Sequence, residues 1–185
     1  MLAQDDRKID ANVHSIAFAD FAGHADKLSQ ASKQAFLQSQ HITAYSFLET
    51  AQCTIANIML IPYNASLTAL SYLGAVRAVP NYHLMGPAKA SLEAVMRGLA
   101  SELGPLPHHV RVNAVSAGPV HTAAARGISD FRTLSQHCHE HSPTGNPTVH
   151  EIAETVTWVA DAAAAGITGQ TIYVDGGYSY IVPVR

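Results

Sequence analysis

The stretch LTALSYLGAVRAVPNYHLMGPAKASLE, residues 67–93, decides the fold of this chain. Its first part, Leu67–Tyr72, is apolar and predicts a buried strand, and its end begins a helix predicted over Ala88–Leu103. Tyr82 and Lys89 stand seven residues apart, close to two helical turns, so we expect both side chains to point into one site. There a lysine ammonium stabilises negative charge, and a tyrosine hydroxyl donates to a developing oxyanion.

Strand and helix signals alternate along the rest of the chain. Apolar runs predict strands at Asn12–Phe18, Val110–Ser116 and Gln170–Val174. Helical spacing predicts a long helix over Ser32–Leu60, and the capping-box pattern at residues 148–151 predicts the start of another. This alternation predicts an α/β fold with a mostly parallel sheet. No linker or internal repeat interrupts residues 1–185, so we expect a single domain.

Composition narrows the class of protein. The 185 residues are 48% hydrophobic and 14% charged, which is typical of a globular chain with one ordinary core. A net charge of −3 without a basic run argues against a nucleic-acid partner. No apolar run reaches the length of a membrane span, and the first residues do not form a signal peptide. Cys53 and Cys138 form no framework, so the chain is predicted to be cytoplasmic, reduced and free of the membrane.

The cluster HCHEH, residues 137–141, has residue types that bind metals. On a helix, however, His137 and His141 lie one turn apart while the residues between them face elsewhere. A structural zinc site needs four converging ligands. We therefore predict a solvated helix or loop here, and no metal.

Several motifs together carry a resemblance to a known family. They are SYLGA at residues 71–75, PNYHLMG at 80–86, AKASLE at 88–93, and RVNAVSAGPV at 111–120 with Thr122. They resemble the NADH-dependent enoyl-[acyl-carrier-protein] reductases, a divergent branch of the short-chain dehydrogenase/reductases. The ordinary branch has its Tyr and Lys four apart and a serine about thirteen residues before the Tyr. Here the gap is seven and Ala69 holds the serine position, which favours the enoyl reductase branch.

The resemblance runs from VHSIAFA at residues 13–19 to VDGG at 174–177 and implies a Rossmann-like three-layer α/β/α fold. It also implies a reaction, in which NADH delivers hydride to the β-carbon of a trans-2-enoyl thioester on acyl-carrier protein. Tyr82 would then donate to the enolate oxygen, and Lys89 would hold the ribose hydroxyls of the cofactor. Tyr72 matches an aromatic position beside the nicotinamide, although a core aromatic at a strand end is the simpler alternative.

The remaining site residues follow from the same resemblance. Positions that match the cofactor site are Ser15, Ile16, Ala17, Ala117, Gly118, Pro119, Val120 and Thr122. Positions that match the acyl pocket are Phe18, Ala19, Tyr72, Met85, Ala124 and Phe131. The stretch Thr122–Phe131 matches a flexible substrate loop and is a candidate lid. For Ser15 a local backbone contact, and for Met85 and Phe131 a plain core role, are the competing interpretations.

A glycine-rich turn for the pyrophosphate is absent near the start of the sequence. Relative to the family, the first three strands are missing, so the remaining sheet is expected to expose a hydrophobic edge. The resemblance further implies a homotetramer built on the helices predicted at 32–60 and 88–103. Two alternatives stay open: a catalytically inactive interaction subunit that docks onto a full-length paralog, and another short-chain reductase of the same fold.

Overall fold

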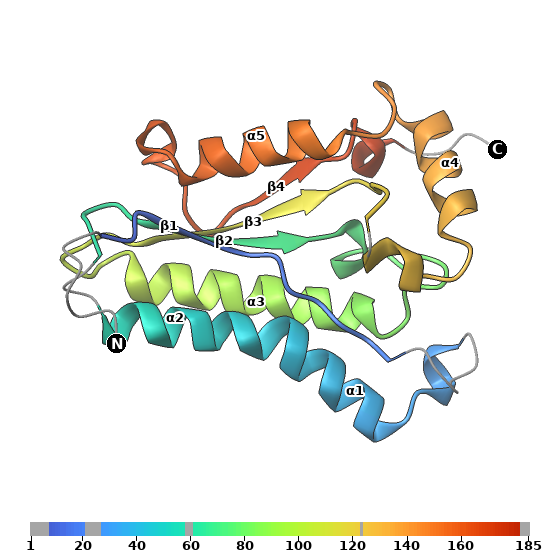
Figure 1. The fold of residues 1–185 in the computed structure, drawn as a ribbon, viewed down its shortest axis with the longest axis horizontal. Helices are drawn as coiled ribbons and strands as arrows, with labels where there is room; N and C mark the ends of the chain where they lie inside the picture. Colours follow the sequence, from blue (N-terminus) through green and yellow to red (C-terminus); the bar gives the residue numbers. More distant parts are fainter. Residues whose placement is uncertain (1–7, 21–26, 58–60, 123, 182–185) are drawn as a thin grey trace.

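Figure 1 presents the computed structural model of the protein, which describes residues 8–20, 27–57, 61–122 and 124–181. Its described part contains one sheet of four parallel strands in the order β1-β2-β3-β4. The strands are β1 (Ala11–His14), β2 (Ser66–Ser71), β3 (Arg111–Ala117) and β4 (Thr171–Val174). The predicted parallel sheet is confirmed, with strand ends shifted by one residue at most for the last three strands.

Helices cover both faces of this sheet (Figure 1). Helices α2 (Ser46–Ala56) and α3 (Met85–Leu103) lie on one face, and α5 (Val149–Ala160) lies on the other. Helix α4 (Phe131–His141) stands beyond the carboxyl ends of the strands. The predicted three-layer α/β/α architecture is therefore confirmed. The assignment of all 185 residues to one domain stays a prediction.

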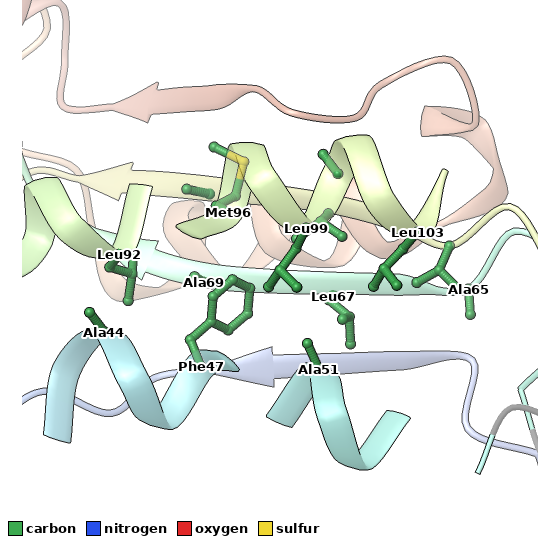
Figure 2. Close-up of a cluster of buried hydrophobic side chains, with 14 of the residues drawn as sticks. Ala44, Phe47, Ala51, Ala65, Leu67, Ala69, Leu92, Met96, Leu99 and Leu103 are labelled. Carbon is green, nitrogen blue, oxygen red and sulfur yellow. The ribbon is translucent and has the colours of Figure 1, made fainter. Parts of the chain in front are cut away.

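The larger core lies between the sheet and the helices α2 and α3. Alternate strand residues point into it, such as Leu67 and Ala69 on β2. Figure 2 shows the Phe47 ring of α2 reaching toward Ala69 and Leu92, and all three side chains are fully or nearly fully buried. A smaller cluster around Val115 packs the opposite face of the sheet against α5. This alternation is what a strand with both faces covered requires, because successive side chains point to opposite faces.

The helix predicted over Ser32–Leu60 is not one regular helix. Ser32 caps α1 (Lys33–Gln40) by accepting from the Ala35 backbone N–H, and a π-helical segment at His41–Tyr45 then joins α1 to α2. Helix α2 ends at Ala56, and residues 58–60 of the predicted helix lie outside the described residues. Apolar spacing cannot reveal a single wider turn, because π-helical turns leave little trace in hydrophobic periodicity.

The strand predicted over Asn12–Phe18 is too long. Strand β1 ends at His14, whose pairing partner is Ala69, and Ser15 and the residues after it leave the sheet. The backbone N–H of Phe18 donates instead to the Thr43 hydroxyl of the π-helical segment, at 3.2 Å. A side-chain acceptor on a neighbouring helix thus replaces the strand ladder here, which an apolar run by itself does not predict.

Two local predictions at helix starts can be tested in detail. Helix α3 begins at Met85, three residues before the predicted start, so Pro87 lies in the first turn, where no backbone donor is needed. At α5, the Thr148 hydroxyl accepts from the Glu151 N–H, and the Glu151 carboxylate accepts from the Thr148 N–H. The predicted capping box is therefore confirmed.

Strand β1 forms one edge of the described sheet. It pairs with β2, and no strand among the described residues pairs with its other side. The side chains of Ile9, Val13 and Ile16 are about half exposed beside this edge. The expected hydrophobic edge is present. Separately, no helix in the described ranges is long and apolar enough to cross a membrane.

Candidate active site

A cleft of about 470 Å³ opens at the carboxyl ends of β1, β2 and β3. Ligands bind at this end of the strands in open parallel sheets. The cleft is lined by Ser15, Ala17, Phe18, Ala19, Leu70, Ser71, Tyr72, Tyr82, Met85, Lys89, Ala117, Gly118, Pro119, Val120, Thr122, Ala125, Gly127, Ile128, Phe131 and Leu134. Most of the residues predicted from separate parts of the sequence therefore lie around one space.

Two tyrosines form a pair at the base of the cleft. Tyr72 follows the end of β2, and Tyr82 lies three residues before α3 rather than on the helix itself. Their rings meet edge to face with centroids 4.8 Å apart, and Tyr82 is 8% exposed. Gly74 permits this arrangement, because a Cβ atom there would collide with the Tyr82 ring. Burial raises the pKa of both phenols, so both are protonated donors at neutral pH.

Lys89 reaches the same cleft from the second turn of α3. Its side chain is 5% exposed, and its ammonium donates to the Leu70 carbonyl at 2.6 Å. Burial lowers the pKa of Lys89 to about 8, and the charge of Glu93 opposes this shift. The Glu93 carboxylate itself accepts a hydrogen bond of 2.5 Å from the Ser71 hydroxyl. An ammonium has three donors, so Lys89 keeps two for a ligand in the cleft.

Tyr82 and Lys89 were expected to share a site because of their helical spacing, but the structure holds them by different elements. Both residues line one cleft, but Tyr82 is positioned by a turn before α3, where its carbonyl accepts from the Gly86 N–H at 2.8 Å. No hydrogen bond joins the Tyr82 and Lys89 side chains in the described structure. The two side chains are therefore positioned independently of each other.

The segment after β1 forms a second wall. Ser15, Ala17, Phe18 and Ala19 line the cleft as predicted, whereas Ile16 is 52% exposed and does not line it. The assignment of Ile16 to the cofactor site, between Ser15 and Ala17, stays a prediction.

The loop after β3 forms the third wall. Ala117, Gly118, Pro119, Val120 and Thr122 all line the cleft. The Gly118 N–H donates to Val174 of β4 at 2.7 Å, and the Thr122 hydroxyl accepts from the Ala125 N–H at 3.2 Å. These two bonds fix both ends of the loop.

A turn of 3₁₀ helix at Ala124–Gly127 follows that loop and leads to α4. Phe131, the first residue of α4, lines the cleft and meets the His121 ring edge to face. The Ala124 side chain lies outside what the structure describes, so its predicted contact stays a prediction. Sequence reasoning missed Ala125, Gly127, Ile128 and Leu134, although they lie in or next to the predicted lid.

A second cavity of about 430 Å³ adjoins the cleft and shares Tyr72 and Leu134 with it. Its wall also includes Arg77, Asn81 and His137. His137 and His141 stack with ring centroids 4.1 Å apart at the end of α4, as the helix interpretation of that cluster predicts. In the described residues, no group of three or more potential metal ligands converges.

The part of the chain that forms the cleft is similar to a known protein family. A protein-family model described as "Enoyl-(Acyl carrier protein) reductase" matches residues 1–179. This chain belongs to the enoyl-(acyl carrier protein) reductase family. The match includes every residue that lines the cleft, so family membership and cleft geometry concern the same part of the chain.

Individual members of the family are closely similar to this chain. It is 46% identical over 173 residues to the enoyl-[acyl-carrier-protein] reductase [NADH] FabI of Neisseria meningitidis serogroup B, covering 92% of this chain and 65% of the relative. It is 43% identical over 174 residues to the FabI [NADH] enzyme of Escherichia coli K12, covering 93% and 64%. The FabI–NADH complex of Alistipes finegoldii has a TM-score of 0.90 at 28% identity, covering 96% of this chain and 62% of that one.

These figures establish a Rossmann-like fold of the reductase family. The chain spans about 65% of the length of the curated relatives that it matches.

Proposed function

We propose that this protein reduces the trans-2 double bond of an enoyl thioester carried on acyl-carrier protein, with NADH as the reductant. The observation that carries the proposal is the single cleft that collects Tyr72, Tyr82, Lys89 and the loop at residues 117–122. The names of the relatives from Neisseria meningitidis and Escherichia coli support both the acyl-carrier-protein substrate and NADH.

The residues present fit a nicotinamide cofactor. Lys89 has two free donors beside an apolar-walled cleft, which suits the hydroxyls of a ribose. Ser15, Ala17 and the residues Ala117–Val120 line the same cleft and, with Ile16, are assigned to the cofactor. When bound, NADH supplies the hydride that is added to the β-carbon of the substrate.

The protein's own contribution is to stabilise charge and to exclude water. Hydride addition places negative charge on the thioester oxygen, and the Tyr82 hydroxyl, protonated at neutral pH, is the donor assigned to that oxygen. Lys89 holds the ribose hydroxyls and keeps a positive charge nearby. Tyr72 packs against the Tyr82 ring and limits its orientation, and Phe18, Ala19, Met85, Ala124 and Phe131 are assigned to the acyl chain. The lid role of Thr122–Phe131 belongs to the same proposal.

The test is consumption of NADH, followed by absorbance, with a crotonyl thioester and the purified chain. Tyr82→Phe is expected to lower turnover by roughly 10²–10³, the usual effect of removing one donor to an oxyanion. Tyr63→Phe is the matched control, because Tyr63 is exposed and lies outside the cleft, and it should leave turnover unchanged. A folded wild-type chain without turnover would contradict the proposal and favour the inactive interaction subunit.

We also propose a homotetramer, assembled in part through the outer face of α1 and α2. Four large apolar side chains are exposed along α1, the π-helical segment and α2, namely Phe36, Leu37, Tyr45 and Ile55. Exposed apolar patches on a folded chain mark contact surfaces. Light scattering should give a mass four times that of the 19.7 kDa chain. A monomer that remains at high concentration would contradict the assembly and leave the catalytic proposal untouched.

A further inference from the structure

His14 ends β1 directly before the cleft wall, and the proposed mechanism does not use it. Its side chain is 3% exposed and packs against the Phe47 ring, with ring centroids 5.3 Å apart. Its strand partner is Ala69, the residue before Leu70, and the Leu70 carbonyl accepts from Lys89. His14 and Lys89 therefore both lie at the same end of β2, His14 beside Ala69 and Lys89 at the Leu70 carbonyl.

The hydrogen bonds around His14 determine its tautomer. The Ser46 hydroxyl donates its single proton to the Ile42 carbonyl at 2.6 Å. The bond of 2.8 Å between His14 Nε2 and Ser46 Oγ must then use a proton on Nε2. His14 Nδ1 is left as a bare acceptor, buried and with no hydrogen-bond partner in the described structure. A buried acceptor without a partner has lost its bond to water and gained none in return, so such an atom calls for a donor.

The Ser46 anchor belongs to the unusual part of the long helix. Ser46 directly follows the π-helical segment, and Thr43 within that segment holds the Phe18 backbone. One wider turn thus fixes both His14 and the wall that follows it. π-helical turns of this kind occur frequently at functional sites.

Lys89 is the charged group that acts on His14. Burial lowers the pKa of His14, the Lys89 charge lowers it further, and the His14 backbone carbonyl opposes both effects. From α3 the other charged side chain is Glu93, which bonds to Ser71, and from the cleft base the titratable groups are Tyr72 and Tyr82. On the π-helical segment and α2, the titratable side chains His41, Tyr45 and Glu49 are exposed to solvent.

We propose that neutral His14 is a positioning residue for Lys89, and that its bare Nδ1 accepts, through a bridging water, one of the two free ammonium protons. The π-helical segment holds the imidazole in this tautomer through Ser46. Protonation of His14 removes the acceptor and places a second positive charge beside the first, so it displaces Lys89 from its ligand-holding position. The consequence for catalysis rests on the proposed reductase function, whereas the coupling between the two side chains does not.

The sign of the pH effect follows directly. The pKa of His14 in the folded chain lies below 6.5, the ordinary value for histidine, so the coupling is intact at pH 6.5 and is lost as the pH falls through that lowered pKa. If protonated His14 abolishes the hold of Lys89 on ribose, the dissociation constant for NADH rises up to tenfold for each pH unit below the His14 pKa.

The test that needs no cofactor is an NMR titration of the intact chain. His14 is assigned with His14→Gln and Lys89 with Lys89→Met. We expect the Nε2–H tautomer, a His14 pKa below 6.5, and Lys89 side-chain signals that follow the His14 titration. This acid-side response should vanish in His14→Gln and persist in His150→Gln, an exposed control on α5. A His14 pKa at or above 6.5, or Lys89 signals that ignore it, overturns the proposal.

The functional test measures the NADH dissociation constant from pH 5 to 7 in wild type and the same His variants, a range in which Lys89, with a pKa of about 8, stays mostly protonated. A flat profile for His14→Gln beside a falling affinity in wild type supports the positioning role, and identical profiles overturn it. His14→Asn repeats the test with a shorter neutral side chain if the Gln variant does not fold. Failure of wild type to bind NADH at any pH contradicts the proposed function alone, because the NMR titration still decides the coupling.

Discussion

The walls of the cleft are built in two different ways. The wall from β2 and α3 is part of the core: Lys89 is buried, and Leu92, one turn further along α3, is fully buried against Phe47 and Met96. The walls after β1 and β3 are connecting segments, held by a few hydrogen bonds such as those of Thr43 and Thr122. The groups assigned to charge stabilisation therefore lie on the rigid part, and the groups assigned to ligand contact lie on segments that can adjust.

The largest expected effect comes from shortening a buried side chain beneath the wall formed by β2 and α3. Leu92→Ala should lower the free energy of unfolding by about 2–5 kcal/mol, because it leaves a cavity beside Phe47. Denaturant unfolding measures the change. Val76→Ala, at an exposed position, should stay within about 0.5 kcal/mol of wild type. A loss below about 1 kcal/mol for Leu92→Ala would show that the wall is less tightly packed than the structure indicates.

The next effect is a gain in stability. Lys89→Met should raise the free energy of unfolding at pH 7 by about 2 kcal/mol, since the desolvation cost of the ammonium exceeds the lost bond to Leu70. The folded pKa is about 8 and the ordinary value is 10.5, so the unfolded chain binds more protons between them. Wild-type stability from this group therefore increases with pH across that window.

Unfolding curves of wild type and Lys89→Met at pH 7, 8, 9 and 10 check this prediction. The difference between the two proteins should shrink as the pH rises, while Lys89→Met loses turnover at every pH. If the difference in unfolding free energy between the two proteins did not change with pH, Lys89 would not be desolvated in the folded state. The wall formed by β2 and α3 would then not differ from the other two in burial of its charged group.

A smaller effect is expected away from the cleft. Thr148→Ala should cost about 1 kcal/mol of stability, because α5 loses the cap that Thr148 and Glu151 form at its first turn. Turnover should not change, since α5 covers the face of the sheet opposite α2 and α3 (Figure 1). Thermal unfolding and the NADH assay together separate stability from activity, and a loss of turnover with intact folding would contradict this separation.

The smallest change in stability is expected on an adjustable wall. Thr122→Ala removes the acceptor of the Ala125 N–H in an exposed loop, so unfolding should change by about 0.5 kcal/mol or less. The dissociation constant for NADH should nevertheless rise about threefold to tenfold, equivalent to about 1 kcal/mol. Thr122→Ser restores the hydroxyl and should recover the affinity. Equal losses in both variants would indicate that the methyl group matters instead.

Sequence motifs placed most of the expected site residues in one cleft, but they gave no indication of the role of His14. The cofactor positions at Ser15, Ala17 and Ala117–Val120 and the acyl positions at Phe18, Ala19, Met85 and Phe131 were all expected in one site, and they line one cleft. Ile16 is not among the residues that line the cleft, and its side chain is 52% exposed. His14 appeared in the sequence only as a polar interruption of an apolar run, and no local pattern pairs it with Ser46, thirty-two residues away.

The sequence by itself determined the order of the predicted strands and helices, the capping box at Thr148, and which polar groups were expected in the cleft. These features depend on contacts within a few residues, which periodicity and turn chemistry record. Only the tertiary structure decided where β1 ends, where the long helix widens at His41–Tyr45, and that His14 and Lys89 are desolvated together. Burial and its electrostatic consequences arise from distant segments packing around one space, and no single segment encodes them.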